Sequence, residues 1–291
     1  MVDLPELAKS GFDAVKSVAD LCKIVIEPWQ IRKKVDALDY ADRKKTEIDT
    51  RRRNNQRDVL QGAAKDLDKE RTYEIDPDWF SKFMSIAQDV SDKEVQILFS
   101  KILSGELNHP GTYSIRTLRV LEGLSSEEAK LFVKSLCYSI KTRTKDIILI
   151  DSNFIETDLK SFAKSTLTYS DHLKLEDCGL SRMTEVGFTF RGDKGISLVY
   201  GSLLGVVPSD NESINLSVGS KLTEAGKQLC QVAEELGVVH RDYEFFRQYC
   251  IAIGNYLGKK VSLHKIESYD PDFSDIAYHP EDLINCENLG K

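Results

Sequence analysis

One stretch of the chain, residues 75–124, constrains the fold more than any other, because it is the densest run of paired helix-start, helix-stop and core signals. Asp76 and Pro77 have the arrangement typical of a helix N-cap followed by the first helical position. Apolar residues then recur at the spacing of one helix face: Trp79, Phe80, Phe83, Met84 and Ala87. The pattern predicts a short helix with one buried side.

Further helix boundaries follow at short intervals. Ser91 and Glu94 have the spacing of a capping box, and Ser125 and Glu128 repeat it. Gly105 suits the end of the helix that starts after Ser91. We therefore expect four helices joined by short connections, which together make a compact helical domain.

Three segments of this region carry a family resemblance: IDPDWF, SDKEVQILFSKILSGE and PGTYSIRTL. Together they resemble the core of an uncharacterised bacterial domain-of-unknown-function family whose members have a charged helical N-terminal arm. The core is also similar to abortive-infection alpha proteins, a group associated with bacterial resistance to phage. The resemblance covers roughly residues 27–135, and Phe99 stands where family members often have Trp. It implies a role in phage defence or stress response, with no assigned reaction.

Residues 4–26 predict an amphipathic helix. Its polar face alternates acidic and basic residues, whereas helices that lie on membranes usually carry a Lys/Arg-rich polar face. The sequence therefore favours packing against another helix, in this chain or in a partner, over association with a membrane surface. The candidate contact residues of the apolar face are Leu4, Leu7, Phe12, Val15, Val18, Cys22 and Val25.

Residues 28–71 are densely charged and predict a long, solvated helix, the middle of which has too few apolar residues to pack into a core. Seven basic residues form a candidate phosphate-contacting stripe: Arg43, Lys44, Lys45, Arg51, Arg52, Arg53 and Arg57. Acidic residues are interleaved with this stripe, and no aromatic residue follows Tyr40 to stack on bases. These features favour a salt-bridged arm or one strand of a coiled coil, and nucleic-acid binding is the alternative.

A second cluster of polar residues lies within positions 101–116: Lys101, Glu106, His109, Ser114 and Arg116. A Glu and His pair is able to act as general acid and base. A structural interpretation is simpler, with Ser114 capping a helix and Glu106 bridging to Arg116. Since no nucleophile, oxyanion hole or phosphate loop is recognisable, an enzyme centred on this cluster is the second alternative.

The periodicity changes after residue 145, where short β-branched and apolar runs predict strands. A helix, several strands and the LT-x-x-G pattern of residues 222–226 resemble winged-helix domains, which often bind DNA. In the expected recognition helix, residues 161–179, lysines are balanced by acidic residues. That balance favours protein contact over phosphate contact.

The sequence thus predicts an α+β fold, mainly α, with an amphipathic helix, a long charged helix, a compact helical core and a C-terminal winged-helix-like α/β domain. The predicted segments are 1–72 for the helix and arm, 73–145 for the core, 146–237 for the winged-helix-like domain and 238–291 for a final helix, strand and acidic tail. The six cysteines show no CxxC pair and no histidine at ligand spacing, so we expect no metal site and no disulfide framework. No cofactor motif is present.

No stretch has the roughly 18 consecutive apolar residues of a membrane span, and the N-terminus has no secretory pattern, so we expect a cytoplasmic protein. The net charge of −7 does not favour general nucleic-acid binding. The sequence therefore favours a non-enzymatic defence or stress-response protein that acts through a protein partner or by forming a homo-oligomer.

Overall fold

The structure is a computed structural model of the chain, and it describes residues 40–68, 73–143, 145–150, 167–183, 188–190, 195–208, 214–216, 220–270 and 275–285. The chain divides into two compact units, residues 1–122 and 123–291. The four segments predicted from the sequence remain a prediction. The predicted amphipathic helix, residues 4–26, lies outside the described residues.

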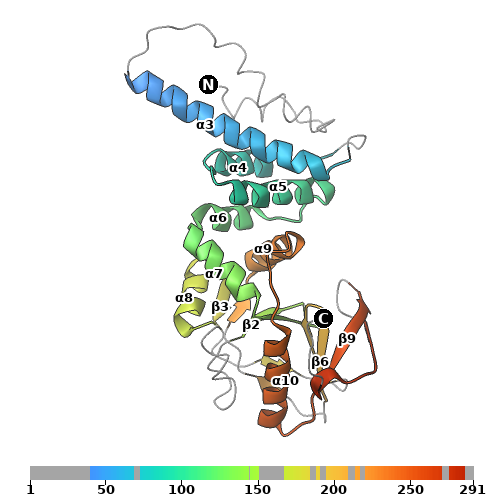
Figure 1. The fold of residues 1–291 in the computed structure, drawn as a ribbon. Coiled ribbons are helices and arrows are strands. Elements are labelled where there is room, and N and C mark those ends of the chain that lie inside the picture. Colours follow the sequence, from blue (N-terminus) through green and yellow to red (C-terminus); the bar gives the residue numbers. More distant parts are fainter. Residues whose placement is uncertain are drawn as a thin grey trace. The chain divides into compact units, whose positions relative to one another are not determined.

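The first unit is helical in its described part (Figure 1). Its elements are α3 Tyr40–Ala63, η2 Ala64–Asp66, α4 Pro77–Ala87, α5 Lys93–Asn108 and α6 Ile115–Gly123. The three helices predicted over residues 75–124 are therefore present. Their apolar faces meet in one core, where Phe83, Phe99 and Ile102 are fully or almost fully buried.

Aromatic contacts organise this core. Trp79 stacks on Phe83 with ring centroids 5.1 Å apart, and Phe83 lies tilted against Phe99 at 5.6 Å. The Trp79 indole N–H donates to the carbonyl of Tyr113 at 2.6 Å, so its polar group is satisfied although the ring is buried. This bond ties α4 to the loop before α6.

Two of the four predicted helix boundaries are confirmed, and two are wrong in detail. Asp76 caps α4, and Ser125 forms a complete capping box with Glu128. Asp92, not Ser91, caps α5, because the Asp92 carboxylate accepts the first free backbone N–H groups of the helix. Gly105 does not end α5 but lies inside it, where an added Cβ would be 2.9 Å from the Tyr113 ring.

The second half of α3 packs on α4 and α5, with Val59, Leu60 and Ala63 buried. An added Cβ at Gly62 would lie 2.2 Å from the Ser100 hydroxyl, so α3 and α5 approach closely at this point. These buried apolar residues follow the charged middle of the arm, residues 41–58, so they do not bear on the expectation that this middle has too few apolar residues to pack into a core. Apolar residues are sparse there, and polar side chains make much of the contact.

Asn55 is the centre of that polar contact and is 6% exposed. Its amide N–H₂ donates to the carbonyl of Gln88 at 2.8 Å and to the Ser91 hydroxyl at 3.2 Å. Its amide oxygen accepts from the Gln96 side chain at 3.2 Å. A buried, fully used amide of this kind fixes how α3 sits on its neighbours.

We expect Asn55→Ala to lower the free energy of unfolding of the first unit by about 2 kcal/mol, because the Gln88 carbonyl loses this donor and the Gln96 amide keeps only its bond to the Val90 carbonyl. Trp79 fluorescence during urea unfolding measures the loss. Asn54→Ala, one position along the same helix and half-buried, is the matched control and should change stability by less than about 0.5 kcal/mol. Equal stability of the two variants would show that the Asn55 network is not needed.

The second unit combines helices with a sheet. Its helices are α7 Ser126–Leu136, α8 Tyr169–Asp177, α9 Glu224–Glu235, α10 Tyr243–Leu257 and η5 Leu283–Asn285. Its strands are β1 Ser139–Thr142, β2 Ile147–Leu149, β3 Ser181–Met183, β4 Phe188–Phe190, β5 Ile196–Tyr200, β6 Leu203–Val207, β7 Ile214–Leu216, β8 Ser220–Leu222, β9 Ser262–Tyr269 and β10 Ile276–Tyr278.

Eight of the described strands form one antiparallel sheet in the order β10-β9-β6-β5-β1-β2-β8-β3, and β4 pairs with β7. Helix α10 covers one face of this sheet, where Leu198, Tyr200 and Phe246 share a buried cluster. The Phe246 ring stacks on Tyr200 at 4.7 Å. Strand alternation directs neighbouring residues such as Val199 to the opposite face, where Val199 packs in a separate small cluster.

The LT-x-x-G pattern begins α9 and fastens it to the turn after α8. Thr223 accepts the N–H of Gly226 at 3.1 Å and donates to the carbonyl of Gly179 at 2.7 Å. An added Cβ at Gly226 would lie 2.1 Å from the carbonyl oxygen of Leu180. Glycine is required here because two backbones approach closely.

The α+β class is confirmed, and the described fold is mainly helical. The winged-helix interpretation of residues 146–237 stays a prediction, since five described strands of this segment, β2, β3, β5, β6 and β8, lie in one sheet with β1, β9 and β10. None of the helices that the structure describes is both long and apolar enough to span a bilayer.

Candidate functional site

A cavity on the second unit lies on the sheet face opposite α10, beside α9. Its main hollow, of about 370 Å³, is lined by Lys141, Lys145, Asp146, Ile147, Lys227, Cys230, Gln231, Glu234 and Tyr269. A second hollow of about 270 Å³ shares three of these residues and is lined by Lys141, Val199, Gly201, Glu234, Val239, Arg241 and Tyr269. We refer to the two together as the cationic cavity.

Regular structure explains why these side chains converge. Lys141 on β1 pairs with Val199 on β5, so both point to the face that α10 does not cover. On α9, Lys227, Cys230 and Glu234 follow one another at helical spacing and fall on one face. The cavity wall is therefore built from one strand face and one helix face.

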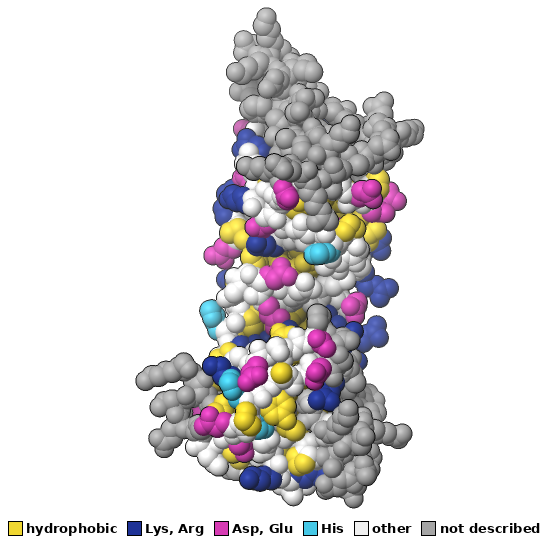
Figure 2. Space-filling model, turned by 90° about the vertical axis from the view of Figure 1, so that its right-hand side faces the viewer, with side chains coloured by type: hydrophobic (Ala, Val, Ile, Leu, Met, Phe, Trp, Pro, Cys, Tyr) yellow, Lys and Arg dark blue, Asp and Glu magenta, His cyan; other side chains and the backbone are white. Residues whose placement is uncertain are grey.

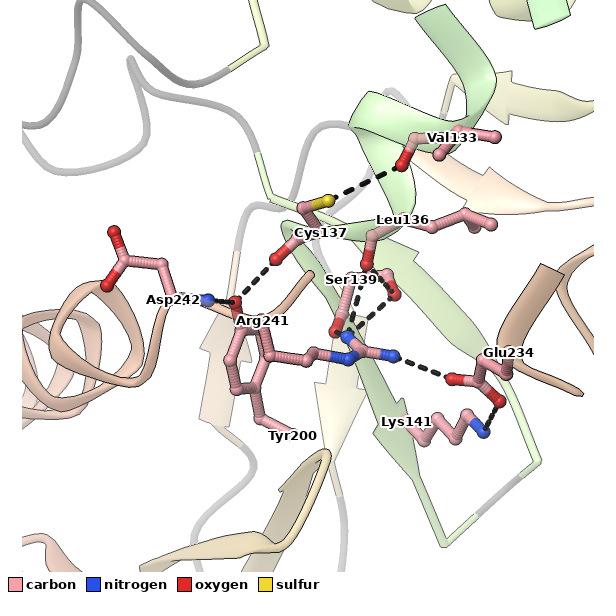
Figure 3. A network of polar contacts seen from close by, with 9 residues as sticks. All are labelled: Val133, Leu136, Cys137, Ser139, Lys141, Tyr200, Glu234, Arg241 and Asp242. Atoms are coloured by element: carbon pink, nitrogen blue, oxygen red, sulfur yellow. Dashed lines mark hydrogen bonds and ion pairs between the residues drawn. The ribbon is translucent and has the colours of Figure 1, made fainter. Parts of the chain in front are cut away.

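Arg241 organises the inner end of the cavity (Figure 3). Its guanidinium donates to the carbonyls of Leu136 and Ser139 at 3.1 and 2.7 Å and to the Glu234 carboxylate at 2.6 Å. The other Glu234 oxygen accepts from Lys141 at 2.6 Å. The Arg241 side chain is 9% exposed, so these charges interact in partly desolvated surroundings.

Tyr200 supports Arg241 from the side of the α10 core. The guanidinium carbon lies 4.9 Å from the centroid of the Tyr200 ring, a cation–π contact. The Tyr200 hydroxyl donates to the carbonyl of Cys137 and accepts the backbone N–H of Asp242 (Figure 3). Burial raises the pKa of Tyr200 above its usual range, so the hydroxyl stays protonated as this network requires.

A second carboxylate is also shared between two cations. Asp146 pairs with Lys221 at 2.6 Å and with Lys227 at 3.7 Å. Among the groups that line the cavity, four are cationic and two are anionic: Lys141, Lys145, Lys227 and Arg241 against Asp146 and Glu234. The lining therefore carries a net charge of +2 on a chain whose net charge is −7.

Lys145 lies at the edge of the cavity and has an unfavourable backbone conformation. It lies in the turn between β1 and β2 with φ of 61°, in the left-handed region, and its N–H donates to the Thr142 carbonyl at 3.0 Å. No other non-glycine residue in the described part of the chain has a positive φ. A lysine there costs stability relative to glycine or asparagine.

We expect Lys145→Asn to raise the free energy of unfolding by about 0.5–1 kcal/mol, because asparagine tolerates the left-handed region better than lysine does. Chemical unfolding followed by circular dichroism measures the change. Lys145→Ala, which lacks the local hydrogen bonding of asparagine, should not stabilise the protein. An Asn variant less stable than the wild type would contradict this account of the turn.

Cys230 lies in the cavity wall as a buried free thiol. Burial raises the pKa of its thiol to about 12, so the thiol stays protonated at neutral pH. Within the described residues, no group of three or more His, Cys, Asp and Glu side chains is placed to hold a metal ion. The charged groups of the lining are therefore its three lysines, Arg241 and the two carboxylates.

The predicted basic stripe lies on α3. The positions of Arg43 and Lys44 fall in the helix, but their side chains lie outside the description, and Lys45 is exposed. Arg52 donates to both oxygens of Asp89 at 2.8 and 3.2 Å, and Arg51 lies 3.7 Å from the same carboxylate. Hydrogen bonding to Asp89 raises the pKa of Arg52 further above its usual value.

Arg57 also has an acidic neighbour, since it lies 3.6 Å from Asp58, and Arg53 is half-buried on the same helix. A groove of about 660 Å³ beside α3 brings Arg51 and Arg57 together with Lys93. On the face drawn in Figure 2, basic and acidic side chains of the described residues are interspersed. The stripe is thus partly neutralised by acidic groups of its own unit.

The predicted partner-helix residues lie outside the described residues: Leu4, Leu7, Phe12, Val15, Val18, Cys22 and Val25. The expected recognition helix is described only in its last part, as α8, which Thr168 opens with a complete capping box. Residues 161–166 lie outside the description.

The polar cluster of residues 101–116 has structural duties. Lys101 pairs with Asp66 at 2.6 Å. Glu106 is 4% exposed, and its two oxygens accept the backbone N–H groups of Gly111 and Tyr113 at 2.6 and 2.8 Å. The predicted bridge from Glu106 to Arg116 is therefore wrong, because the loop itself supplies the donors and Arg116 is exposed.

His109 and Ser114 complete that cluster. The hydroxyl of Ser114 accepts the N–H of Thr117 at 3.2 Å, as expected for a residue that caps α6. The His109 carbonyl accepts from Thr112, and the residue is exposed in the turn. The cluster holds the connection from α5 to α6 in place.

We expect Glu106→Ala to lower the free energy of unfolding of the first unit by about 2–3 kcal/mol, because two backbone N–H groups lose a buried charged acceptor. Urea unfolding followed by Trp79 fluorescence measures it, since Trp79 bonds to the same loop. Glu94→Ala, an exposed glutamate at the start of α5, is the control and should cost less than about 1 kcal/mol. A Glu106 variant with unchanged stability would reopen a chemical role.

Sequence reasoning missed the cationic cavity. Its residues come from β1, the β1–β2 turn, α9, the segment before α10 and the end of β9, over more than a hundred positions. Each is an ordinary lysine, arginine or carboxylate in its own segment, so no local motif marks it. The left-handed backbone conformation of Lys145 could not be predicted from the sequence either, because glycine or asparagine would be the expected residue there.

Comparison with known proteins gives one result. A family model described as protein of unknown function (DUF2806) matches residues 40–247, which span α3 to α6 of the first unit and most of the second unit, including the β1–β2 turn, α9 and Arg241. No curated protein and no solved structure matches the chain. The matched region is well over half of the 291 residues, and the chain therefore belongs to the DUF2806 family of proteins of unknown function.

Proposed function

We propose that the protein is a non-enzymatic bacterial defence or stress-response protein that acts by self-association, or by contact with a protein partner, and that its C-terminal unit is a sensing or docking module. The observation that carries this proposal is the division of α3 into two halves. The second half packs on α4 and α5, whereas residues 45–48 are exposed. One helix is thus anchored in its own unit and offers its other half to another molecule.

The composition of the exposed half fits a helical contact. Ile48 is 43% exposed in a stretch that is otherwise charged or polar, and the predicted amphipathic helix of residues 4–26 lies earlier in the same unit. An exposed apolar residue among mixed charges is typical of a helix that pairs with another helix. The resemblance of the core to abortive-infection alpha proteins supports a role in defence.

A non-enzymatic role is supported by the structural contacts of the polar cluster of residues 101–116. Lys101, Glu106 and Ser114 each bond to a structural partner in the first unit. A carboxylate that accepts two backbone N–H groups is not available as a general base without breaking the loop it holds.

The winged-helix-like interpretation belongs to the sensing or docking role of the second unit. Support comes from α8, which lies against β3, and from the pairing of β3 with β8 beside it. On α8, Tyr169 and Leu173 are one turn apart and 57% and 40% exposed. Exposed aromatic and aliphatic side chains suit protein contact better than phosphate contact.

Light scattering tests self-association. One chain has a mass of 32.9 kDa, and we expect the full chain to exceed this mass and a variant without residues 1–30 to return to it. Phe12→Asp on the predicted apolar face should act like the deletion. Lys9→Asp on the opposite face is the matched control and should leave the mass unchanged. A full chain that is monomeric at all concentrations, and that captures no partner through residues 1–48, would contradict the proposal.

A plaque assay tests the defence role. Cells that express the full chain should form fewer plaques on challenge with a panel of phages than cells that express the Phe12→Asp variant at equal protein level. Equal plaque counts for both variants and for empty cells would contradict a defence role that depends on self-association.

Nucleic-acid binding is the second candidate, favoured by the groove beside α3 that gathers Arg51, Arg57 and Lys93. Fluorescence anisotropy with DNA and RNA at increasing salt tests it. Because Arg52 is bonded to Asp89, reversing it would also damage the fold, so the useful variant combines Lys45→Glu with Arg53→Glu. Loss of salt-dependent binding in that variant would support this candidate, and absence of binding at low salt would reject it.

A further inference from the structure

The cationic cavity has the charge of an anion-binding site. Its two carboxylates are each shared by two cations, Glu234 by Lys141 and Arg241 and Asp146 by Lys221 and Lys227. Lys227 also lies 3.6 Å from Glu224, whose side chain is 73% exposed, so this further pair is screened by solvent. Among the described residues, no carboxylate forms an ion pair with Lys145. Lys141 and Lys227 are only 22% and 25% exposed, and their charges therefore act in a region of reduced dielectric.

The cavity also has the volume of a small-molecule site, and an aromatic side chain lies in its lining. The hollows of about 370 and 270 Å³ share Lys141, Glu234 and Tyr269, and small-molecule sites typically measure about 300–1,000 Å³. Tyr269 is 47% exposed and lines both hollows. An aromatic ring beside clustered lysines offers a stacking surface next to a phosphate-binding surface.

The backbone conformation of Lys145 also supports a binding role for this side chain. A lysine in the left-handed region costs stability, and the hairpin turn would accept glycine or asparagine more easily. Strain of this kind is found where a side chain must be kept at a site. The turn places the Lys145 charge in the lining of the main hollow.

We propose that the cationic cavity binds a small phosphorylated ligand with an aromatic ring, of the nucleoside diphosphate class, with its phosphates on Lys141, Lys145 and Lys227 and its ring against Tyr269. This inference rests on the proposed sensing role of the second unit and names the ligand class that it senses. Arg241 is a positioning residue, because its donors are used by Leu136, Ser139 and Glu234 and hold the Glu234–Lys141 pair in place.

Titration calorimetry on the full chain tests the inference with ADP, pyrophosphate and adenosine as probes, at low and at physiological ionic strength. We expect ADP to bind, adenosine to bind at least about tenfold more weakly because it lacks the phosphates, and the affinity for ADP to fall as salt rises. Pyrophosphate should bind more weakly than ADP, because it has no ring to contact Tyr269.

Two variants with matched controls assign the contacts. Lys145→Asn should weaken ADP and pyrophosphate by about tenfold, although the same change is expected to stabilise the fold, so lost binding cannot be attributed to unfolding. Lys130→Gln, an exposed lysine on α7, should have no effect. Tyr269→Ala should weaken ADP but not pyrophosphate, whereas Tyr278→Ala on β10, 41% exposed and away from the lining, should change neither.

Several results would overturn the inference. These are no binding of any probe at low salt, undiminished ADP binding in both Lys145→Asn and Tyr269→Ala, and equal affinities for ADP and pyrophosphate in the wild type. Light scattering on the same preparations separates the two proposals. A chain that self-associates through residues 1–30 but binds no probe would overturn the ligand class and leave the proposed function standing.

Discussion

Replacing Arg241 with Met should lower the free energy of unfolding of the second unit by about 3 kcal/mol, the lower end of the cost of removing one partner from a buried ion pair, because the Glu234 side chain is 30% exposed. The change keeps most of the side-chain volume but removes every donor that the guanidinium supplies. The Ser139 carbonyl would lose its guanidinium donor, the Leu136 carbonyl would keep only the Ser139 hydroxyl, and Glu234 would keep only Lys141. The cation–π contact with Tyr200 would be lost as well.

Far-UV circular dichroism during thermal unfolding measures this effect, and a loss of that size should lower the melting temperature of the second unit by roughly 10 °C. Tryptophan fluorescence is the internal reference, because Trp29 and Trp79 both lie within residues 1–122. Arg247→Met on α10 is the matched control. Arg247 is 21% exposed, pairs with Glu244 one turn away and donates to the Ile284 carbonyl at 3.0 Å, so its loss should cost about 1–2 kcal/mol. Equal losses for the two arginines would contradict the central role of Arg241.

Gly226→Ala should destabilise the second unit by more than about 3 kcal/mol, although alanine is the better helix former. The added methyl group would lie 2.1 Å from the Leu180 carbonyl oxygen, a backbone atom that cannot rotate away. The start of α9 would have to move off the turn after α8, which would also stretch the bonds of Thr223 to Gly226 and Gly179.

The matched control is Gly123→Ala at the end of α6, where an added Cβ meets nothing within 4 Å. That change should be neutral or slightly stabilising, because it removes a flexible residue without creating a contact. Calorimetry of both variants compares them directly. A Gly226 variant as stable as the Gly123 variant would mean that α9 is free to shift, and the close approach would then not explain the glycine.

The sequence predicted local structure well where one residue decides it. Asp76 and Ser125 cap helices as expected, because the capping side chain and the free N–H groups lie within a few residues of each other. Ser91 was mistaken for a cap because Asp92 follows it directly and is an equally good acceptor. Local patterns place the start of a helix to within a residue or two. Which of two adjacent capping residues accepts the free N–H groups depends on the backbone geometry at that point.

Contacts between distant segments could not be predicted in this way. Asn55 looked like part of a solvated arm, and only the placement of Gln88 and Gln96 shows that its amide is buried and fully bonded. The cationic cavity has the same origin, because Lys141 and Glu234 are 93 positions apart. An antiparallel sheet with long connections brings such residues together, and nothing within either segment encodes the other.

The bonds of Arg241 also set an order of events during synthesis. Strand β1 pairs with β5 and β2. The carbonyls of Leu136 and Ser139 accept hydrogen bonds from the Arg241 guanidinium, which lies 105 and 102 positions later in the chain and is therefore synthesised after both of them. The helical first unit relies on nearer contacts and can fold while the ribosome is still making the sheet. A nascent chain stalled before Arg241 should therefore present a protease-resistant first unit and a second unit that is still open to cleavage.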